Sequence, residues 1–340
     1  METACQIIGA LTDRLRLTED RPAAIDRFIF RAGVWKPRTS PHTYQGAGEK
    51  GLEWLQEVKR QFGVPVATEV ATPEHVQAAL EAGIDYLWIG ARTAANPIAV
   101  KSIADRLCLA EERPTAPDGV QTELPKGVFI KNPVHNDPQL WLGNIERLEQ
   151  TGVPVMAVHR GCGHQPCWSM AHQVRLARPD IPMLLDPSHM SGNAAQVPEL
   201  LTRMSELGLD GAMIEVHCHP ESALSDNAQQ ITPTCLRDCL DPILSRLCLA
   251  SLICPHDSQE SMTELAWLRA EIDELDERLW QMIEQRMDVS RRIGEWKKAH
   301  GVAPLQPERY QQIAERLKVK GDYALQIWEL IHEESLKQQK

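Results

Sequence analysis

Seven short apolar runs in about the first 220 residues each end on charged or polar side chains that are suited to chemistry. The runs alternate with stretches of helical spacing, and this alternation predicts parallel strands in βα units. Barrels built from such units carry their active sites at the carboxyl ends of the strands. The chain is therefore expected to present a rim of basic, acidic and histidine side chains. The residues that end the runs are Arg31, Glu69, Arg92, Lys131, Arg160, Asp186 with His189, and Glu215.

The pattern along the chain separates a barrel from a purely helical segment. Helical spacing lies between the apolar runs, at residues 51–62, 73–82, 140–149, 170–178 and 197–207. These units predict an α/β TIM-type (β/α)8 barrel over residues 1–249, of which seven strands can be counted in the sequence. Pro255, His256 and Asp257 then interrupt the pattern, so residues 250–261 are expected to form a linker.

Charge balance and apolar content limit the classes of function. The 340 residues include 36 Lys and Arg against 47 Asp and Glu, a net charge of −11. This balance argues against nucleic acid as a partner, although it allows a local basic pocket. No apolar run reaches the roughly 20 residues that cross a membrane, and the N-terminus has no apolar signal segment. Nine cysteines without framework spacing favour a reducing compartment. We therefore expect a soluble cytoplasmic protein.

The segment RAGVWKPRTSP, residues 31–41, concentrates positive charge after the first predicted strand. It holds Arg31, Lys36 and Arg38, and Thr39 adds a hydroxyl group. Two prolines restrict the backbone around Arg38 and Thr39. Three cations on a restricted loop favour the binding of phosphate or carboxylate groups. The alternative interpretation is a solvated surface loop.

This segment resembles the signature of 3-deoxy-D-arabino-heptulosonate 7-phosphate (DAHP) synthases of the short, type Iβ-like subgroup. The resemblance covers about residues 1–245. The related KDO8P synthases share the barrel and the phosphoenolpyruvate site but have KANRS where this chain has KPRT at 36–39. The KPRT run therefore favours erythrose 4-phosphate as second substrate, with a KDO8P synthase-like enzyme as the alternative. Further similar segments follow in family order: IGART at 89–93, IKNP at 130–133, HRG at 159–161, DPSHMSG at 186–192, IEVH at 214–217 and ALSDNAQQ at 223–230.

The resemblance implies a role for each matching side chain. Arg31, Lys36 and Lys131 would hold the carboxylate of phosphoenolpyruvate. Its phosphate would lie against Arg92 and Arg160. The phosphate of erythrose 4-phosphate would be held by Arg38 and Thr39. A divalent metal would be bound by His189, Glu215 and Asp226, and one nitrogen with two carboxylates tolerates Mn²⁺, Fe²⁺, Zn²⁺ or Co²⁺. Without its neighbours, His189 would be interpreted as a core or turn histidine.

The start of the chain departs from the family. The family opens with a strand that ends in AGPCS, whose cysteine is the fourth metal ligand. Met1-Glu2-Thr3 is similar to the tail of that motif, so the strand and its cysteine are expected to be missing. Cys5 is a weaker substitute because it is expected on the first helix. The departure leaves a second alternative, an inactive barrel that scaffolds or regulates an active partner domain.

Residues 262–340 have a purely helical pattern. Apolar residues repeat at three and four positions from Leu265 to about Trp296, which predicts a helix roughly 50 Å long. Thr263 is the expected N-cap, and shorter helices are expected at 307–317 and 323–337. A helix of this length needs partners for its apolar stripe, so we expect a homodimer through this segment.

Four basic residues stand out against the apolar pattern: Arg269, Arg286, Lys297 and Arg309. Arg286 and Lys297 are 11 positions apart and nearly eclipse each other on an ideal helix, whereas Arg269 lies roughly 100° away. This spacing favours a site shared between two protomers, and a solvated charged face is the alternative. The segment, with LAWLRAEIDELDERLWQMIEQR, IGEWK, PER and IHEESLKQQ, resembles an all-helical AroQ-type chorismate mutase.

The second resemblance implies that chorismate rearranges to prephenate at this site without a cofactor. Arg269 of the partner subunit, Arg286 and Arg309 would bind the two carboxylates. Lys297 and Gln339 would hydrogen-bond the ether oxygen. Ser335 would line the pocket. The expected whole is a bifunctional enzyme of aromatic amino acid biosynthesis with phosphoenolpyruvate, erythrose 4-phosphate and chorismate as substrates.

Overall fold

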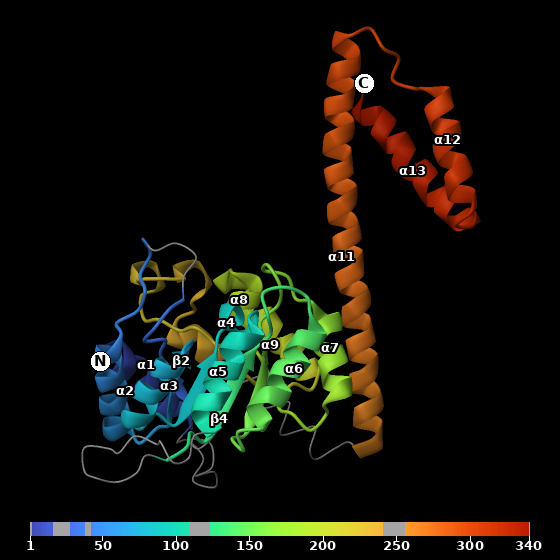
Figure 1. The fold of residues 1–340 in the computed structure, drawn as a ribbon. Coiled ribbons are helices and arrows are strands. Elements are labelled where there is room, and N and C mark those ends of the chain that lie inside the picture. Colours follow the sequence, from blue (N-terminus) through green and yellow to red (C-terminus); the bar gives the residue numbers. More distant parts are fainter. Residues whose placement is uncertain (1, 16–27, 38–41, 109–122, 241–255, 340) are drawn as a thin grey trace. The chain divides into compact units, whose positions relative to one another are not determined.

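The computed structural model describes residues 2–15, 28–37, 42–108, 123–240 and 256–339, with helices and strands labelled in Figure 1. Its contacts divide the chain into two compact units, Met1–Ala270 and Glu271–Lys340. The domain boundaries expected from the sequence stay a prediction, since a division by contacts is a different criterion.

Seven parallel strands form the sheet of the first unit, and they pair in the order in which they occur along the chain. Each strand coincides with one of the seven apolar runs, so the predicted parallel sheet is confirmed. Thr68, for example, lies opposite Leu87 on the next strand. The strands are β1 (Phe30–Arg31), β2 (Val66–Val70), β3 (Tyr86–Ile89), β4 (Gly127–Lys131), β5 (Val155–His159), β6 (Met183–Leu185) and β7 (Gly211–Ala212).

Helices connect successive strands and lie outside the sheet (Figure 1). Several start with a capping side chain followed by proline: Thr72 accepts the His75 N–H, and Asp137 accepts the Leu140 N–H. The helices predicted between the strands are confirmed. The helices of this unit are α1 (Glu2–Leu15), α2 (Glu49–Phe62), α3 (Pro73–Glu81), α4 (Ala91–Ala94), α5 (Pro97–Cys108), α6 (Pro138–Glu149), α7 (Trp168–Ala177), α8 (Pro187–Ser191) and α9 (Val197–Glu206).

Apolar side chains are buried in two clusters of the first unit. The larger cluster joins the strands to the surrounding helices. The smaller cluster gathers one side chain each from β2, β3, β4 and β5 and one that follows β7. Large and small apolar side chains from successive strands fill the interior of a barrel in the same way. The members of the smaller cluster are Ala67, Trp88, Phe129, Val158 and Met213.

Asp85 anchors the amino-terminal ends of β2 and β3. Its side chain is 4% exposed and lies 3.0 Å from both Lys59 Nζ and Lys126 Nζ. It also accepts the Val66 N–H at 3.1 Å. Burial raises the pKa of Asp85, but Lys126, the Val66 amide and Lys59 outweigh burial and hold the pKa below its usual range.

Replacing Asp85 with asparagine is expected to lower the free energy of unfolding by about 2 kcal/mol at pH 7. Because the folded-state pKa is depressed, this stabilisation exists above the unfolded pKa of about 3.9 and is lost as pH falls through the folded value. Denaturant unfolding at pH 7 and near pH 3 measures the difference. The exposed Asp105, replaced by asparagine, serves as the control with an effect under about 0.5 kcal/mol. An equal effect of Asp85→Asn at both pH values would contradict the assignment.

The C-terminal segment is helical, as predicted. Its helices are α11 (His256–Ala299), α12 (Pro307–Lys318) and α13 (Asp322–Gln338). α11 begins at His256, inside the expected linker, so Thr263 lies within the helix and the prediction that it is the N-cap was wrong. Gly294 has a packing role, because a Cβ there would lie 2.6 Å from Gln339 Cα. Within the ranges described, no helix is both long and apolar enough to cross a membrane.

Candidate functional site

The carboxyl ends of the strands bring most of the predicted barrel residues together. Arg31 ends β1, Lys131 ends β4, and Arg160 directly follows β5. His189 lies on α8 after β6, and Glu215 comes shortly after β7. Because the seven strands are parallel, these ends meet at the same edge of the sheet. The predicted rim is therefore present in the fold.

A buried ion pair lies within this rim. Lys131 Nζ is 2.7 Å from Asp186 Oδ2, and the two side chains are 6% and 0% exposed. Asp186 also accepts the backbone N–H of His189 and lies 3.0 Å from its Nδ1. Burial raises the pKa of Asp186, but His189, Lys131 and Arg31 outweigh burial and hold the pKa well below its usual range. The Asp186 carboxylate therefore orients the His189 ring through Nδ1, with Nε2 on the other side of the ring.

Glu215 faces the other nitrogen of this histidine. Its Oε1 is 3.9 Å from His189 Nε2 and 3.3 Å from Arg31 Nη2. Gln229 donates to Oε2 at 2.8 Å. Burial raises the pKa of Glu215, but His189, Arg31 and the Gln229 hydrogen bond outweigh burial, and the pKa is lowered. Glu215 is thus held as a carboxylate beside the histidine.

Asp226 lies in a tight turn near the predicted basic loop. Its backbone has φ of 56°, in the left-handed region that is costly for a residue with a side chain. Its Oδ2 is 3.3 Å from Lys36 Nζ, and Lys36 also donates to Ser225 Oγ. The structure therefore pairs two predicted site residues, Lys36 and Asp226, with each other.

The predicted metal ligands fit a divalent ion only in part. A histidine nitrogen oriented by a carboxylate and a second carboxylate 3.9 Å away suit a divalent ion, and His189 with Glu215 make this pair. Asp226 is held by Lys36 instead. Within the described part of the chain, no three His, Cys, Asp or Glu side chains are arranged to hold one metal ion. The expected three-residue metal site is therefore not assembled in this structure.

The two arginines predicted to hold phosphate follow β3 and β5, with β4 between these strands. Arg160 receives support from Asn132, whose Oδ1 accepts its backbone N–H at 2.7 Å. The Arg160 guanidinium donates to the His189 carbonyl at 3.4 Å, and burial lowers the pKa of Arg160. Arg92 is exposed and donates to the Pro37 carbonyl at 3.3 Å. The remaining predicted residues of the basic loop, Arg38 and Thr39, lie outside the described residues.

Glu69 belongs to the same site, although the sequence-based set of substrate and metal residues left it out. Burial raises the pKa of Glu69, although Lys131, Arg31 and His189 act in the opposite direction. The glycine at position 90 leaves room for it, because a Cβ there would lie 2.1 Å from Glu69 Oε1. Its place at the end of an apolar run was the available signal. Burial therefore outweighs the neighbouring charges of Lys131 and Arg31 at Glu69.

The second unit holds a cluster of predicted residues between α11 and α13. Arg286 donates to Ser335 Oγ and, at 3.2 Å, to the Ile331 carbonyl. Lys297 Nζ is 3.1 Å from Gln339 Oε1. Ser335 is 2% exposed, and burial lowers the pKa of Arg286. The structure therefore brings together four of the six residues predicted for the helical site.

The other two predicted residues of the helical site are exposed. Arg269 belongs to the first contact unit, and Arg309 lies on α12. The structure adds His332, which sequence analysis did not select. Its ring stacks on Trp328, and its Nε2 is buried without a hydrogen-bond partner in the described part of the chain. Burial, Arg286 and then Lys297 lower the pKa of His332.

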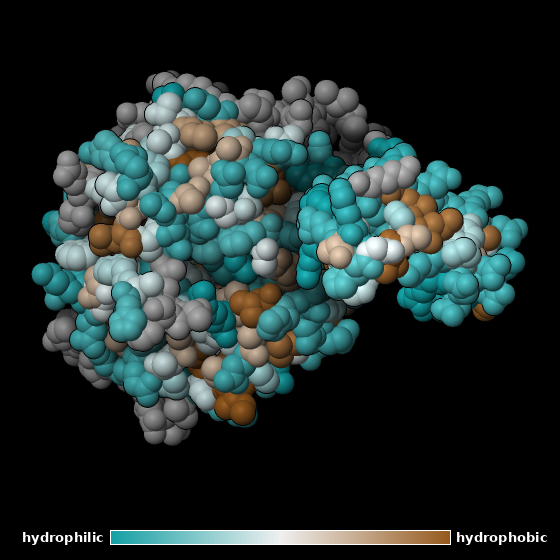
Figure 2. Space-filling model, turned by 90° about the horizontal axis from the view of Figure 1, so that it is seen from above, coloured by the Kyte–Doolittle hydropathy of each residue, from teal (hydrophilic) through white to brown (hydrophobic). Residues whose placement is uncertain are grey.

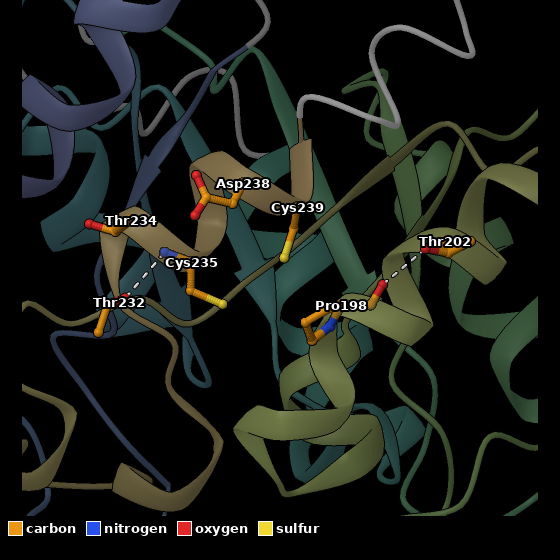
Figure 3. Close-up of a pocket in the computed structure, with 7 residues that line it drawn as sticks. All are labelled: Pro198, Thr202, Thr232, Thr234, Cys235, Asp238 and Cys239. Carbon is orange, nitrogen blue, oxygen red and sulfur yellow. Dashed lines mark hydrogen bonds between the residues drawn. The ribbon is translucent and has the colours of Figure 1, made fainter.

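A separate cavity of about 530 Å³ lies between α9 and the helical residues 233–240 (Figure 3). None of the described residues that line it has a basic side chain. Burial and the neighbouring Cys235 thiol raise the pKa of Cys239 to about 11, which keeps this thiol protonated. The lining residues are Pro198, Thr202, Thr232, Thr234, Cys235, Asp238 and Cys239.

A parallel sheet with helices around it and with cations and carboxylates at its strand ends defines an α/β barrel-type protein. The chain belongs to the DAHP synthetase I family, whose sequence model matches residues 14–109 and 121–243. Residues 268–340 match a second family, chorismate mutase type II. Both resemblances predicted from the sequence are therefore confirmed.

This chain covers only part of the length of its individual relatives. Phospho-2-dehydro-3-deoxyheptonate aldolase of Thermotoga maritima is 29% identical over 210 residues, which are 60% of this chain and 56% of the relative. This chain thus spans little more than half of that protein. 2-Dehydro-3-deoxyphosphooctonate aldolase of Helicobacter pylori is 27% identical over 223 residues, 61% of this chain and 78% of the relative.

Solved structures agree with the barrel fold. The crystal structure of the Thermotoga maritima DAHP synthase has a TM-score of 0.53 at 27% identity and covers 66% of this chain and 62% of that chain. A truncated form of the 3-deoxy-D-arabino-heptulosonate 7-phosphate synthase from the same organism has a TM-score of 0.54 at 23% identity. It covers 74% of this chain and 82% of that chain and supports the fold alone.

Proposed function

We propose that the barrel unit condenses phosphoenolpyruvate with erythrose 4-phosphate to form DAHP. The observation that carries the proposal is the group of cations around the buried Asp186 carboxylate and the partly buried Glu215 carboxylate. Lys131 and Arg31 lie within 3.3 Å of these carboxylates at the carboxyl ends of the strands. Membership of the DAHP synthetase I family supports the proposal. A substrate with one carboxylate and one phosphate matches a rim that is rich in arginine and lysine.

The reaction forms one carbon–carbon bond and releases one phosphate. C3 of phosphoenolpyruvate attacks the aldehyde carbon of erythrose 4-phosphate, water adds at C2, and inorganic phosphate leaves. Arg92 and Arg160 would hold the phosphate that leaves, while Arg31, Lys36 and Lys131 would hold the carboxylate. These contacts would fix C3 towards the aldehyde and offset the negative charge of the two substrates.

The aldehyde substrate would be held by two residues of the basic loop. Arg38 and Thr39 would bind the phosphate of erythrose 4-phosphate, a role that follows from the KPRT run. We also propose that a divalent metal, Mn²⁺, Fe²⁺, Zn²⁺ or Co²⁺, binds His189 and Glu215, with Asp226 as third ligand once it leaves Lys36. When bound, such an ion would polarise the aldehyde oxygen as a Lewis acid.

A substrate comparison tests this function against its closest rival. The chain is incubated with phosphoenolpyruvate and either erythrose 4-phosphate or arabinose 5-phosphate, with each divalent metal or with a chelator. We expect phosphate release with erythrose 4-phosphate that is at least tenfold faster than with arabinose 5-phosphate. Faster release with arabinose 5-phosphate would support a KDO8P synthase-like enzyme. Release with neither aldehyde, at any metal, would favour a barrel that only supports the helical unit.

We further propose that the helical unit rearranges chorismate to prephenate. Arg286, Lys297, Ser335 and Gln339 lie together between α11 and α13, which supports a pocket for a dianionic substrate. Arg309 and Arg269 of the partner subunit would complete the binding of the two carboxylates. The rearrangement needs no nucleophile, so a held conformer and positive charge near the breaking C–O bond are enough.

A homodimer through the helical unit follows from the exposed apolar side chains of α11. Ile272, Leu275, Leu279 and Met282 are 50–68% exposed, and spaced at three and four positions they form one stripe. Hydrophobic residues also reach the surface of the C-terminal helices among hydrophilic ones (Figure 2). A second copy of α11 would cover this stripe. Light scattering should give twice the mass of one chain, and a monomer at micromolar concentration would overturn the dimer.

We also place the protein in the cytoplasm, where nine cysteines stay reduced.

A further inference from the structure

The loop that carries Arg160 has a costly backbone. This loop, residues 160–167, connects β5 to α7 and is called the β5–α7 loop here. Two residues with side chains, His164 and Cys167, have φ of 63° and 49°, and two glycines of the loop also have positive φ. Backbone in the left-handed region is unfavourable for a residue with a side chain, so the surroundings must hold it.

Groups inside the barrel hold the start and the end of this loop. Asn132 accepts the Arg160 N–H at 2.7 Å and donates to the Gly161 carbonyl at 3.1 Å. His159, which is 0% exposed, contacts the Pro166 carbonyl through Nε2. His159 is the last residue of β5, so its ring connects the end of this strand to the far end of the loop.

Aromatic packing continues outward from this histidine. The His159 ring lies 5.5 Å from the ring of Trp168, the first residue of α7. Trp168 is 5% exposed and follows the strained Cys167 directly. Movement of Trp168 would therefore move the end of the β5–α7 loop, and the next layer decides whether Trp168 can move.

That next layer comes from α11. Trp267 is 2% exposed, and its ring meets Trp168 edge-on at 6.2 Å. The same ring stacks on His172 at 5.3 Å with an interplanar angle of 8°. His172 is in turn 3.3 Å from Glu264 through Nε2. These residues all belong to the first contact unit, which extends to Ala270.

We propose that Trp267 is a positioning residue for Arg160 in the barrel site. It covers the outer side of Trp168, which holds His159 and the end of the β5–α7 loop, and so fixes the guanidinium that binds the phosphate of phosphoenolpyruvate. The inference rests on the proposed barrel function. The inference makes the first turns of α11 a functional part of the barrel. The segment that matches the chorismate mutase family begins only at residue 268.

A purely structural role for Trp267 makes a different prediction. If it only attached α11 to α7, its loss would lower the amount of folded protein without a selective effect on one substrate. A positioning role instead predicts a higher KM for phosphoenolpyruvate, with kcat and the KM for erythrose 4-phosphate changed by less than threefold. An aromatic replacement should restore the wild-type KM for phosphoenolpyruvate, because a phenyl ring keeps the contact with Trp168.

The experiment measures DAHP formation by the full-length chain and three variants. Trp267→Ala should raise the KM for phosphoenolpyruvate at least tenfold, and Trp267→Phe should return it to within threefold of the wild-type value. The matched control is Trp54→Ala, because Trp54 is a 45% exposed tryptophan of the same unit, and it should leave every constant unchanged. Chorismate rearrangement by each variant reports on the second unit.

Three results would overturn the inference. These are an unchanged KM for phosphoenolpyruvate in Trp267→Ala, an equal rise for both substrates, or no recovery in Trp267→Phe. If Trp267→Ala does not fold, Trp267→Leu takes its place with the same expectation. The proposed barrel function is tested separately, because wild-type protein that forms no DAHP would reject that function before any variant is compared.

Discussion

Replacing Arg286 with alanine should lower chorismate rearrangement at least about 1,000-fold while DAHP formation stays within twofold. Arg286 lies against Ser335 and the Ile331 carbonyl, and burial lowers its pKa, so its charge acts in a partly dehydrated pocket. Positive charge held there would stabilise the developing negative charge of the pericyclic transition state. Steady-state assays of both reactions on the same preparation measure the two effects.

The comparison for this variant comes from the same helix. Arg291 on α11 is 55% exposed and pairs with Asp288 on the surface, so its replacement by alanine should leave both activities unchanged. Arg286→Lys keeps the charge but loses the planar fork, and we expect it to recover less than a tenth of the lost activity. Retention of mutase activity in Arg286→Ala would remove Arg286 from the site.

Replacing Lys131 with methionine should lower DAHP formation at least about 1,000-fold and weaken the barrel as well. Lys131 is 6% exposed and 2.7 Å from Asp186, which is fully buried. Methionine keeps most of the volume but leaves the Asp186 charge without its cation. Breaking a buried pair in this way costs about 3–5 kcal/mol of unfolding free energy. Denaturant unfolding and the DAHP assay measure the two effects.

A surface lysine gives the reference for Lys131. Lys101 is 65% exposed and pairs with Asp105 on α5, so Lys101→Met should change neither activity nor stability by a measurable amount. The mutase activity of Lys131→Met should persist, because Arg286, Ser335 and the Lys297–Gln339 pair lie in the other contact unit. Normal DAHP formation by a folded Lys131→Met protein would show that the substrate carboxylate lies elsewhere.

The sheet was predictable from the sequence because each strand is a short apolar run with a polar end. Arg31, Lys131 and Arg160 could be placed on one rim because the carboxyl ends of parallel strands share one edge. Helix starts were also predictable where a capping side chain precedes proline, as at Thr72. The start of α11 was not predictable, because helix formation at 256–261 overrides the local turn signals.

Contacts between distant residues were beyond sequence reasoning. In the sequence, Asp186 is recognisable only as the polar residue that ends an apolar run. Its pairing with Lys131 spans 55 positions. The sequence assigned Asp226 to the metal, whereas the fold pairs it with Lys36 through a turn. Trp267 was not selected from the sequence, and its contact with Trp168 depends on where α11 packs. In the helical unit, the roles of Ser335 and Gln339 came from resemblance to a family and not from spacing.

The central claim is that one chain carries two separate sites for two reactions. The most direct measurement assays wild-type protein, Arg286→Ala and Lys131→Met for both DAHP formation and chorismate rearrangement. We predict that wild-type protein catalyses both reactions, Arg286→Ala loses only the second and Lys131→Met loses only the first. Loss of both activities in either folded variant, or wild-type protein that catalyses only one reaction, would contradict the claim.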